Sequence, residues 1–261
     1  MACFTPMYLE QHNVYVPCGK CPGCHSARAS AWSFRMQQEA KISTSAYFVT
    51  LTYDTKHVPI TPNGFMSLSK RDCQLFFKRL RKNWPQTIRY YLAGEYGDSF
   101  NRPHYHVILF NSDPQRIVDA WGNGDVHIAD VNPKTCAYTL KYITKGRWKP
   151  MHKRDDRAPL FSLMSKGLGK NYLTEQMQDW HKANPAQRVY CTTSEGVKIT
   201  MPRYYKDKIY SEEERALIAE HGLDRQTEEQ RKQRAANPNH DRDREQYVLN
   251  QFVKAKMTIK K

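Results

Sequence analysis

The stretch His104-Tyr105-His106-Val107-Ile108-Leu109-Phe110 decides the fold, and it predicts a β-strand. Residues two apart in a strand project from the same face. The two histidines therefore point together, while Tyr105 points the other way, toward a core. The sequence thus predicts a strand that carries two imidazoles on one face and ends in an apolar tail.

A second expected strand, residues 88–95, precedes this one and is joined to it by a turn over 96–103. In such a hairpin Glu95 lies across from His104 or His106, on the same face. Two imidazoles and a carboxylate have the composition of a divalent-metal site. Two alternatives use the same residues: a pair of structural histidines on a surface strand, and the two-histidine, one-carboxylate site of an iron oxygenase.

On both sides of this hairpin, hydrophobic periodicity predicts further strands and helices. The expected strands are 47–53, 88–95, 104–110 and 125–131, and the expected helices are 26–41, one that begins near Ser67 or Ser69, 113–121 and 132–145. The order strand, helix, strand, strand, helix, strand indicates an α+β fold with a ferredoxin-like antiparallel sheet and helices on one face.

The last of these helices carries two tyrosines, Tyr138 and Tyr142, with Lys141 and Lys145 beside them. A spacing of four puts both tyrosines on one helix face. Tyrosines at this spacing usually pack, but next to a metal site they suit DNA strand cleavage. A phenol oxygen attacks the scissile phosphate, and neighbouring lysines hold the phosphate and favour the phenolate. An iron oxygenase has no use for this pair.

The charge balance favours a nucleic acid as partner. Lysine and arginine total 41 against 26 acidic residues, which gives a formal charge of +15, and 16 tyrosines accompany them. Aromatic rings beside positive charge suit single-stranded DNA. The candidate DNA contacts are Lys78, Arg81, Lys82, Arg102, Lys166 and Lys170. No apolar run approaches the roughly 20 residues of a membrane span, so no membrane partner and a cytoplasmic location are expected.

A cysteine cluster near the N-terminus predicts a structural zinc site. Cys18, Cys21 and Cys24 follow one another at intervals of three, and either Cys3 or His25 is a candidate fourth ligand. An iron–sulfur cluster would need a fourth cysteine shortly after the third, and none is there. The remaining alternative is a loop of free thiols.

The chain is expected to have three regions: a Cys-rich segment and helix over 1–40, a core over 41–175, and a C-terminal appendage over 176–261. The appendage begins with a hairpin of strands 188–192 and 197–201. From Ser211 onward the sequence is highly charged and predicts helices that are broken around residues 237–239.

Several of these motifs occur together, in order, in a known family. The motifs are Phe48-Val49-Thr50-Leu51-Thr52-Tyr53, Gly94-Glu95-Tyr96-Gly97, Arg102-Pro103-His104-Tyr105-His106 and Tyr138-x-x-Lys141-Tyr142-x-x-Lys145. They resemble the three motifs of HUH rolling-circle replication initiators, above all those of microviruses of the gokushovirus type. Two further stretches resemble that group: Pro17-Cys18-Gly19-Lys20-Cys21-x-x-Cys24-x-x-x-Arg28-x-x-x-Trp32 and Pro202-Arg203-Tyr204-Tyr205-Lys206.

The resemblance implies an HUH endonuclease fold in which His104 and His106 bind a metal ion. The carboxylate and imidazole donors favour a divalent cation, Mn²⁺ or Mg²⁺. The resemblance also implies that Tyr138 and Tyr142 are nucleophiles and that Lys141 contacts a phosphate. The implied partners are single-stranded DNA at a replication origin and the helicase and polymerase of a bacterial host, in whose cytoplasm the protein would act. Plasmid initiators, transposases and relaxases use the same chemistry. From another class, a non-catalytic, zinc-containing single-stranded DNA-binding protein remains the alternative.

Overall fold

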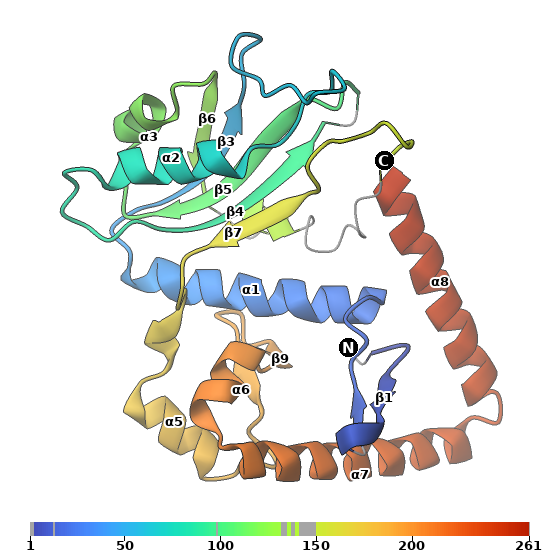
Figure 1. Ribbon diagram of the computed structural model, residues 1–261. Helices are drawn as coiled ribbons and strands as arrows, with labels where there is room; N and C mark the ends of the chain where they lie inside the picture. The colour runs from blue at the N-terminus through green and yellow to red at the C-terminus, as the bar shows by residue number, and fades with distance from the viewer. Residues whose placement is uncertain are drawn as a thin grey trace. The chain divides into compact units, whose positions relative to one another are not determined.

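A computed structural model describes residues 3–12, 14–97, 99–131, 135–136, 139–140 and 150–260 (Figure 1). The chain divides into two compact units. The first, here called the sheet unit, is Ser33–Asn171. The second, here called the terminal unit, combines Met1–Trp32 with Tyr172–Lys261.

The sheet unit is built on a five-stranded antiparallel sheet with the strand order β6-β3-β5-β4-β7. Its elements are β3 (Ala46–Thr52), α2 (Lys70–Arg81), β4 (Arg89–Tyr96), β5 (Pro103–Phe110), α3 (Pro114–Trp121), β6 (Val126–Asp130) and β7 (Phe161–Met164). The first six follow the predicted strand–helix order, and their four strands are arranged as the ferredoxin-like plan requires. The helix expected over 132–145 lies largely outside the described residues.

The fifth strand, β7, is not among the strands predicted from the sequence. β7 is four residues long, and its pairing with β4 joins positions about seventy residues apart. A strand this short has too few residues to show an alternating pattern. The hydrogen bonds to β4 define it, and they are invisible in the local sequence.

Local capping interactions set where the two helices over the sheet begin and end. The Ser69 side chain caps α2 by accepting a hydrogen bond from the Asp72 amide at 3.1 Å. Asp113 caps α3 in the same way, Pro114 occupies its first turn, and Gly122 ends it with a φ of 63°. Both helices cover the same face of the sheet (Figure 1), as predicted.

The core lies between these helices and the sheet. The buried residues of α2 have the three-four spacing of one helix face and pack on alternate residues of β3 and β5. They are Cys73, Phe76, Phe77 and Leu80. Within the core, the Tyr105 hydroxyl contacts the Tyr53 hydroxyl at 2.9 Å and accepts from the Ser69 amide at 2.8 Å. Tyr105 therefore fastens the start of α2 to the strand that carries the two histidines.

The C-terminal half of α1 (Pro22–Ile42) belongs to the sheet unit and is held to it by polar contacts. The buried Glu39 carboxylate accepts hydrogen bonds from Arg89 of β4 at 3.1 Å and from the Gly169 amide at 2.7 Å. Arg35 donates to the Leu168 carbonyl at 2.9 Å. These bonds fix the loop after β7 beside α1.

The terminal unit holds the chain's remaining elements. They are β1 (Met7–Leu9), η1 (Glu10–His12), β2 (Val14–Val16), α5 (Glu175–Lys182), β8 (Tyr190–Thr192), β9 (Lys198–Thr200), α6 (Arg203–Ile209), α7 (Glu212–Ala236) and α8 (His240–Lys260), while η2 (Lys170–Tyr172) lies where the two units meet in the chain. The predicted hairpin and the charged helices broken near residues 237–239 are confirmed. No described helix is both long and apolar enough to cross a membrane.

Candidate metal centre

Strand pairing gathers the predicted carboxylate and imidazoles. Glu95 of β4 lies directly opposite His104 of β5, and His106 lies opposite Ala93. Tyr105, Val107 and Leu109 of the same strand belong to the core under α2 and α3. Because side chains alternate along a strand, the two histidines project from the other sheet face. The predicted grouping of Glu95, His104 and His106 is confirmed.

The three side chains meet at one carboxylate oxygen. Glu95 Oε1 lies 2.7 Å from His104 Nε2 and 2.9 Å from His106 Nε2, within hydrogen-bond distance of both. The side chains of Glu95 and His106 are 4% and 6% exposed, whereas that of His104 is 20% exposed. The cluster is therefore buried on the Glu95 side and reachable from solvent on the His104 side.

The Nδ1 atom of each imidazole has a partner of its own. His106 Nδ1 contacts the Thr50 hydroxyl at 3.1 Å, and His104 Nδ1 contacts the Arg102 carbonyl oxygen at 3.2 Å. Phe48 stacks on the His106 ring at a centroid distance of 5.5 Å and an angle of 10°. Contacts of this kind set ring orientation and tautomer in metal-binding histidines. They leave both Nε2 atoms directed at Glu95, with the candidate ligand atoms within 4.8 Å of one another.

Sequence reasoning missed Thr50, Phe48 and Gly94 as parts of this site. Thr50 and Phe48 belong to β3, whose pairing with β5 is non-local, so their register with His106 is not readable from local sequence. At Gly94 the chain lies close to its neighbours: a Cβ there would lie 3.1 Å from the Tyr105 ring and 3.2 Å from Leu68. The available signals were the motif that contains Phe48 and Thr50 and the glycine directly before Glu95.

The proposed catalytic residues Tyr138, Lys141, Tyr142 and Lys145 lie outside the described residues. Their roles therefore stay predictions.

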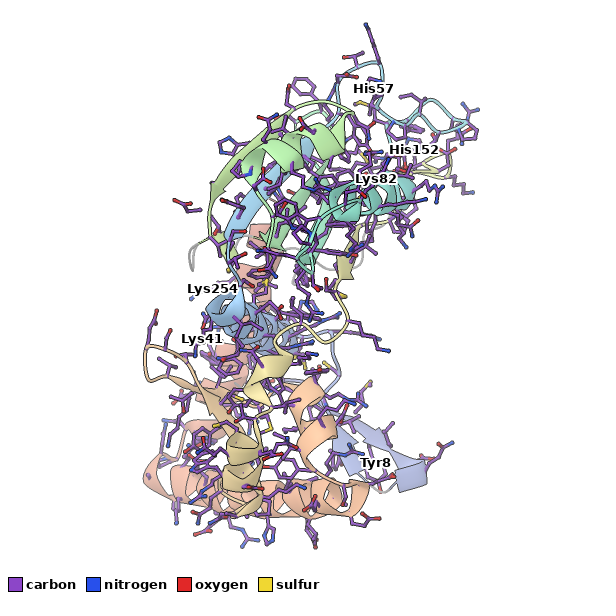
Figure 2. All side chains as sticks on the ribbon, turned by 90° about the vertical axis from the view of Figure 1, so that its left-hand side faces the viewer. Tyr8, Lys41, His57, Lys82, His152 and Lys254 are labelled. Carbon is purple, nitrogen blue, oxygen red and sulfur yellow. The ribbon has the colours of Figure 1, made fainter. Side chains whose placement is uncertain are left out.

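The candidate DNA contacts fall into three places. Arg102 donates from Nε at 3.2 Å and Nη2 at 2.7 Å to the Tyr53 carbonyl, so its guanidinium braces the end of β3 beside His104. Lys78, Arg81 and Lys82 are exposed at the C-terminal end of α2, over the opposite sheet face (Lys82 in Figure 2). Lys166 and Lys170 are exposed in the loop after β7. The structure does not bring these lysines and Arg81 to the Glu95 cluster, and their contact with DNA stays a prediction.

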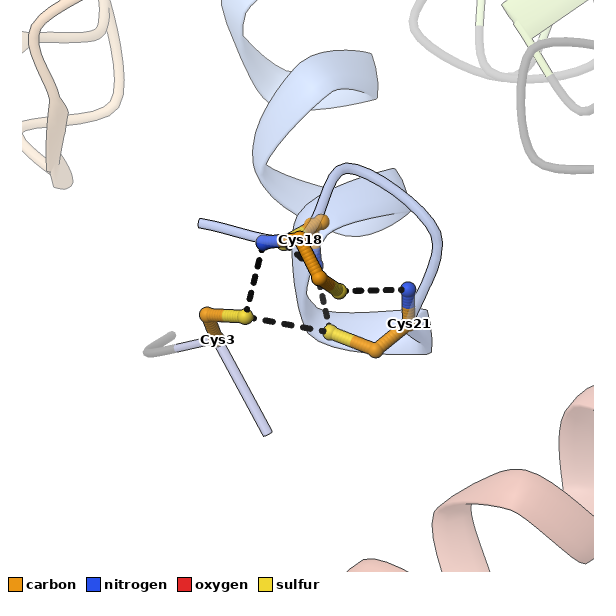
Figure 3. Close-up of side chains that lie close together, drawn as sticks. Cys3, Cys18 and Cys21 are labelled. Atoms are coloured by element: carbon orange, nitrogen blue, oxygen red, sulfur yellow. Dashed lines mark hydrogen bonds between the residues drawn. The ribbon is translucent and has the colours of Figure 1, made fainter. Parts of the chain in front are cut away.

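A second group of ligand-type side chains lies in the terminal unit, where Cys3, Cys18, Cys21 and Cys24 converge. Figure 3 shows three of them, Cys3, Cys18 and Cys21. Cys3 is the fourth member, and His25 is not part of the group. Although burial raises the pKa of Cys18, hydrogen bonds from Thr5 and from the Lys20 and Cys21 amides lower it to about 6. Burial, followed by the neighbouring Cys3 thiol, raises the pKa of Cys24 to about 12.

Residues 46–147 match the model of a replication-associated protein family, the ORF2 family. The chain is a relative of phage replication-associated proteins. The predicted resemblance to replication proteins of microvirus-type phages is thus confirmed. The matched segment runs from β3 past β6 and includes Glu95, His104 and His106, together with the undescribed Tyr138 and Tyr142.

Three relatives show how far the similarity extends. The replication-associated protein ORF2 of Spiroplasma virus 4 is 29% identical over 224 residues, which cover 77% of this chain and 69% of the relative. The replication-associated protein VP4 of Bdellovibrio phage phiMH2K is 28% identical, covering 73% and 66%. The replication-associated protein ORF4 of Chlamydia phage 1 is 23% identical, covering 81% and 56%. The latter two alignments thus span less than two thirds of the relative. No solved structure matches the chain.

Proposed function

We propose that this protein is an HUH-class replication initiator endonuclease, which nicks single-stranded DNA at an origin through a tyrosine nucleophile. One observation carries the proposal: Glu95, His104 and His106 converge on one sheet face within the segment that matches the replication-associated protein family. The nick leaves a 5′-phosphotyrosine link and a free 3′-hydroxyl for rolling-circle synthesis, and a later transfer religates the strand.

The proposed nucleophiles are Tyr138 and Tyr142. The phenol oxygen forms a bond to the scissile phosphorus while the bond from phosphorus to the 3′ oxygen breaks. The phenolic proton is lost, and the departing 3′ oxygen takes up a proton and becomes the hydroxyl. One phosphodiester replaces another, so the reverse reaction reseals the strand without ATP. Lys141 and Lys145 hold the phosphate and favour the phenolate in this scheme.

The donor set fits a divalent cation. A carboxylate suits hard cations such as Mg²⁺ and Mn²⁺, and two imidazoles tilt the preference toward Mn²⁺. Glu95, His104 and His106 would hold the ion, which when bound supplies polarisation of the phosphate oxygens. Thr50 and the Arg102 carbonyl keep both imidazoles turned with Nε2 toward the carboxylate. The partly exposed His104 side is where a phosphate would reach the site.

The proposed partners follow from this chemistry. The formal charge of +15 supports binding to single-stranded DNA, whose phosphates release counterions when lysine and arginine replace them. Host helicase and polymerase would unwind and extend the nicked strand. The proposed setting is the cytoplasm of the bacterial host.

Covalent attachment to DNA tests the proposal. The full chain is mixed with Mn²⁺ and a random-sequence single-stranded DNA pool that carries a 3′-terminal dye, and the products are run on a denaturing gel. A 5′-phosphotyrosine link leaves the dye on the protein, whereas the same pool labelled at its 5′ end gives only shortened free strands. Peptide mass spectrometry of the adduct then identifies the modified tyrosine.

The control is the double variant Tyr138→Phe/Tyr142→Phe, which keeps both rings and removes both nucleophilic oxygens. We expect it to lose the adduct and to retain native DNA binding. An adduct that persists in this variant, or that maps to another residue, would contradict the nucleophile assignment. Retention of DNA in a native gel with no adduct from the wild-type chain, on the pool and on viral single-stranded DNA from a microvirus of the relatives' kind, would favour the non-catalytic binding protein.

A further inference from the structure

We propose that Cys3, Cys18, Cys21 and Cys24 form a closed four-thiolate zinc site that fixes the N-terminal segment and seats Phe4 against α8. The site lies in the terminal unit, so the inference stands independently of the function proposed for the Glu95 cluster. The sequence left the fourth ligand open between Cys3 and His25. The structure assigns it to Cys3.

The sulfur positions match the geometry that zinc requires. Cys21 Sγ lies 3.8 Å from Cys3 Sγ, and Cys18 Sγ lies 3.9 Å from Cys24 Sγ. A tetrahedral site with zinc–sulfur bonds of about 2.3 Å places its sulfurs about 3.8 Å apart. A disulfide would need about 2.05 Å. The four thiols are free of disulfides and stand at the separation of co-ligands.

Backbone amides surround the sulfurs as they would surround thiolates. Cys18 Sγ accepts from the Lys20 amide at 3.4 Å and from the Cys21 amide at 3.3 Å. Cys21 Sγ accepts from the Cys24 amide at 3.4 Å and from the Phe4 amide at 3.3 Å. Hydrogen bonds from amides stabilise the negative charge that a metal-bound sulfur carries.

The chain is shaped to bring the ligands together. Gly19 adopts a φ of +69°, a conformation that favours glycine, and so the chain turns directly after Cys18. Cys21 and Cys24 then lie at the beginning of α1, which starts at Pro22. Cys3 arrives from a separate segment, and its Sγ accepts from the Cys18 amide at 3.3 Å (Figure 3). Four protein ligands leave no open position, which is typical of a structural zinc site.

The proposed zinc site is connected to α8 through Phe4. The Phe4 ring contacts Tyr247 and Phe252 of α8 edge-on, each at a centroid distance of 6.2 Å. Phe4 directly follows the proposed ligand Cys3, and its amide donates to the sulfur of Cys21. Zinc binding at the four sulfurs therefore determines where Phe4 stands, and through Phe4 it holds the charged C-terminal helix within the terminal unit.

Metal analysis of the full chain tests the site. The purified protein is expected to contain one zinc per chain. After exchange with Co²⁺ under reducing conditions, it should show the visible bands and the strong near-ultraviolet sulfur-to-cobalt transition of a tetrahedral tetrathiolate. Hydrogen exchange of the Phe4 and Cys18 amides should be slow in the zinc-loaded chain and fast after chelation.

Three matched variants locate the ligands. Cys3→Ser should weaken the near-ultraviolet transition and shift the visible bands, because one sulfur ligand is lost. His25→Ala should leave the spectrum unchanged. His104→Gln/His106→Gln should leave the sulfur-to-cobalt transition unchanged, because the Glu95 cluster contains no sulfur. Phe4→Ala should keep the cobalt spectrum and speed hydrogen exchange in α8.

The wild-type measurements decide the outcome even if Cys3→Ser misfolds. A zinc-free chain whose cobalt form lacks sulfur-to-metal transitions would overturn the proposal, as would non-reducing mass spectrometry that finds disulfides among the four cysteines of freshly prepared protein. Iron in place of zinc would also overturn it. A spectrum lost on His25→Ala and kept on Cys3→Ser would reject the ligand set.

Discussion

Glu95, His104 and His106 stand on two paired strands in the middle of the sheet unit, whereas the four cysteines of the terminal unit come from a tight turn, a helix start and a separate N-terminal segment. The ladder of backbone hydrogen bonds holds the first group in place whether or not an ion is bound. In the second group, Cys3 and Cys18 flank the short β1–β2 hairpin, and the Cys18 amide donates to the Cys3 sulfur. The Glu95 cluster is thus preorganised by its strands and partly open to solvent, whereas four cysteine ligands would leave a bound ion no open position.

The largest expected effect comes from removing the two imidazoles. His104→Gln/His106→Gln leaves amides that can still donate to the buried Glu95 carboxylate but bind metal poorly. We expect covalent attachment to DNA to fall by about 1000-fold or more, since each 1.4 kcal/mol of lost transition-state stabilisation costs about a factor of ten. Gel assays measure this loss.

The exposed His57, which pairs with Asp54, offers a matched control. His57→Gln should nick as the wild type does. If the His104→Gln/His106→Gln variant nicked as fast as His57→Gln, the sheet site would have no role in the reaction.

The next effect concerns stability. Cys3→Ser should destabilise the terminal unit by about 4 kcal/mol or more, the size seen when a structural metal is lost. Hydrogen exchange resolved by peptide should show faster exchange in residues 3–32 and 172–260, with β3 to β6 unchanged. Equal loss of protection in the sheet strands would break the distinction between a preorganised site and a metal-dependent one.

A smaller effect is expected at Thr50, which positions His106 through its hydroxyl. Thr50→Val removes that contact while keeping the shape, and we expect Mn²⁺ affinity to fall about tenfold, as for other partners of metal-binding histidines. Thr50→Ser should restore the affinity. Mn²⁺ titration followed by electron paramagnetic resonance measures the affinity of each variant. Equal affinities in wild type and Thr50→Val would show that the Nδ1 contact of His106 does not contribute to Mn²⁺ binding.

The smallest expected effect is on the pH dependence of stability, and it comes from His181, a histidine outside the Glu95 cluster. His181 is fully buried, its Nδ1 donates to the Arg188 carbonyl at 2.6 Å, and its Nε2 accepts from Tyr172 at 2.9 Å. Burial lowers the pKa of His181 in the folded protein. Below a pH of about 6.5 the unfolded chain therefore binds a proton that the folded chain does not, and stability falls by up to about 1.4 kcal/mol per pH unit.

Above that pH the group is neutral in both states and contributes no pH dependence. His181→Gln should thus be less sensitive to acid than the wild type between about pH 7 and pH 5. Urea unfolding at a series of pH values measures the two slopes. Identical slopes would mean that His181 does not remain neutral in the folded chain.

The sequence predicts the strand that carries His104 and His106 and its hairpin with β4 because both depend on local patterns. Alternation places the histidines together, and a short turn fixes which carboxylate faces them. The caps at Ser69 and Asp113 are local as well, which is why α2 and α3 begin near their predicted positions.

What the sequence misses depends on contacts between distant residues. The pairing of β7 with β4, the alignment of Thr50 with His106 and the choice of Cys3 over His25 all join segments separated by fifteen residues or more. The role of Arg102 is missed for the same reason. Its guanidinium donates to the Tyr53 carbonyl, forty-nine positions away, while its contact with DNA stays a prediction.

The most direct test is a metal add-back experiment in which zinc content and DNA attachment are measured on the same sample. The chain is dialysed against a mild chelator until its weakly bound ions are removed, and then titrated with Mn²⁺ in the presence of 3′-labelled single-stranded DNA. We predict that one zinc per chain persists throughout, that no adduct forms before Mn²⁺ is added, and that adduct yield then rises with Mn²⁺. Adduct formation without Mn²⁺, or restored only when zinc is replenished, would contradict the assignment of the Glu95, His104 and His106 cluster to the reaction.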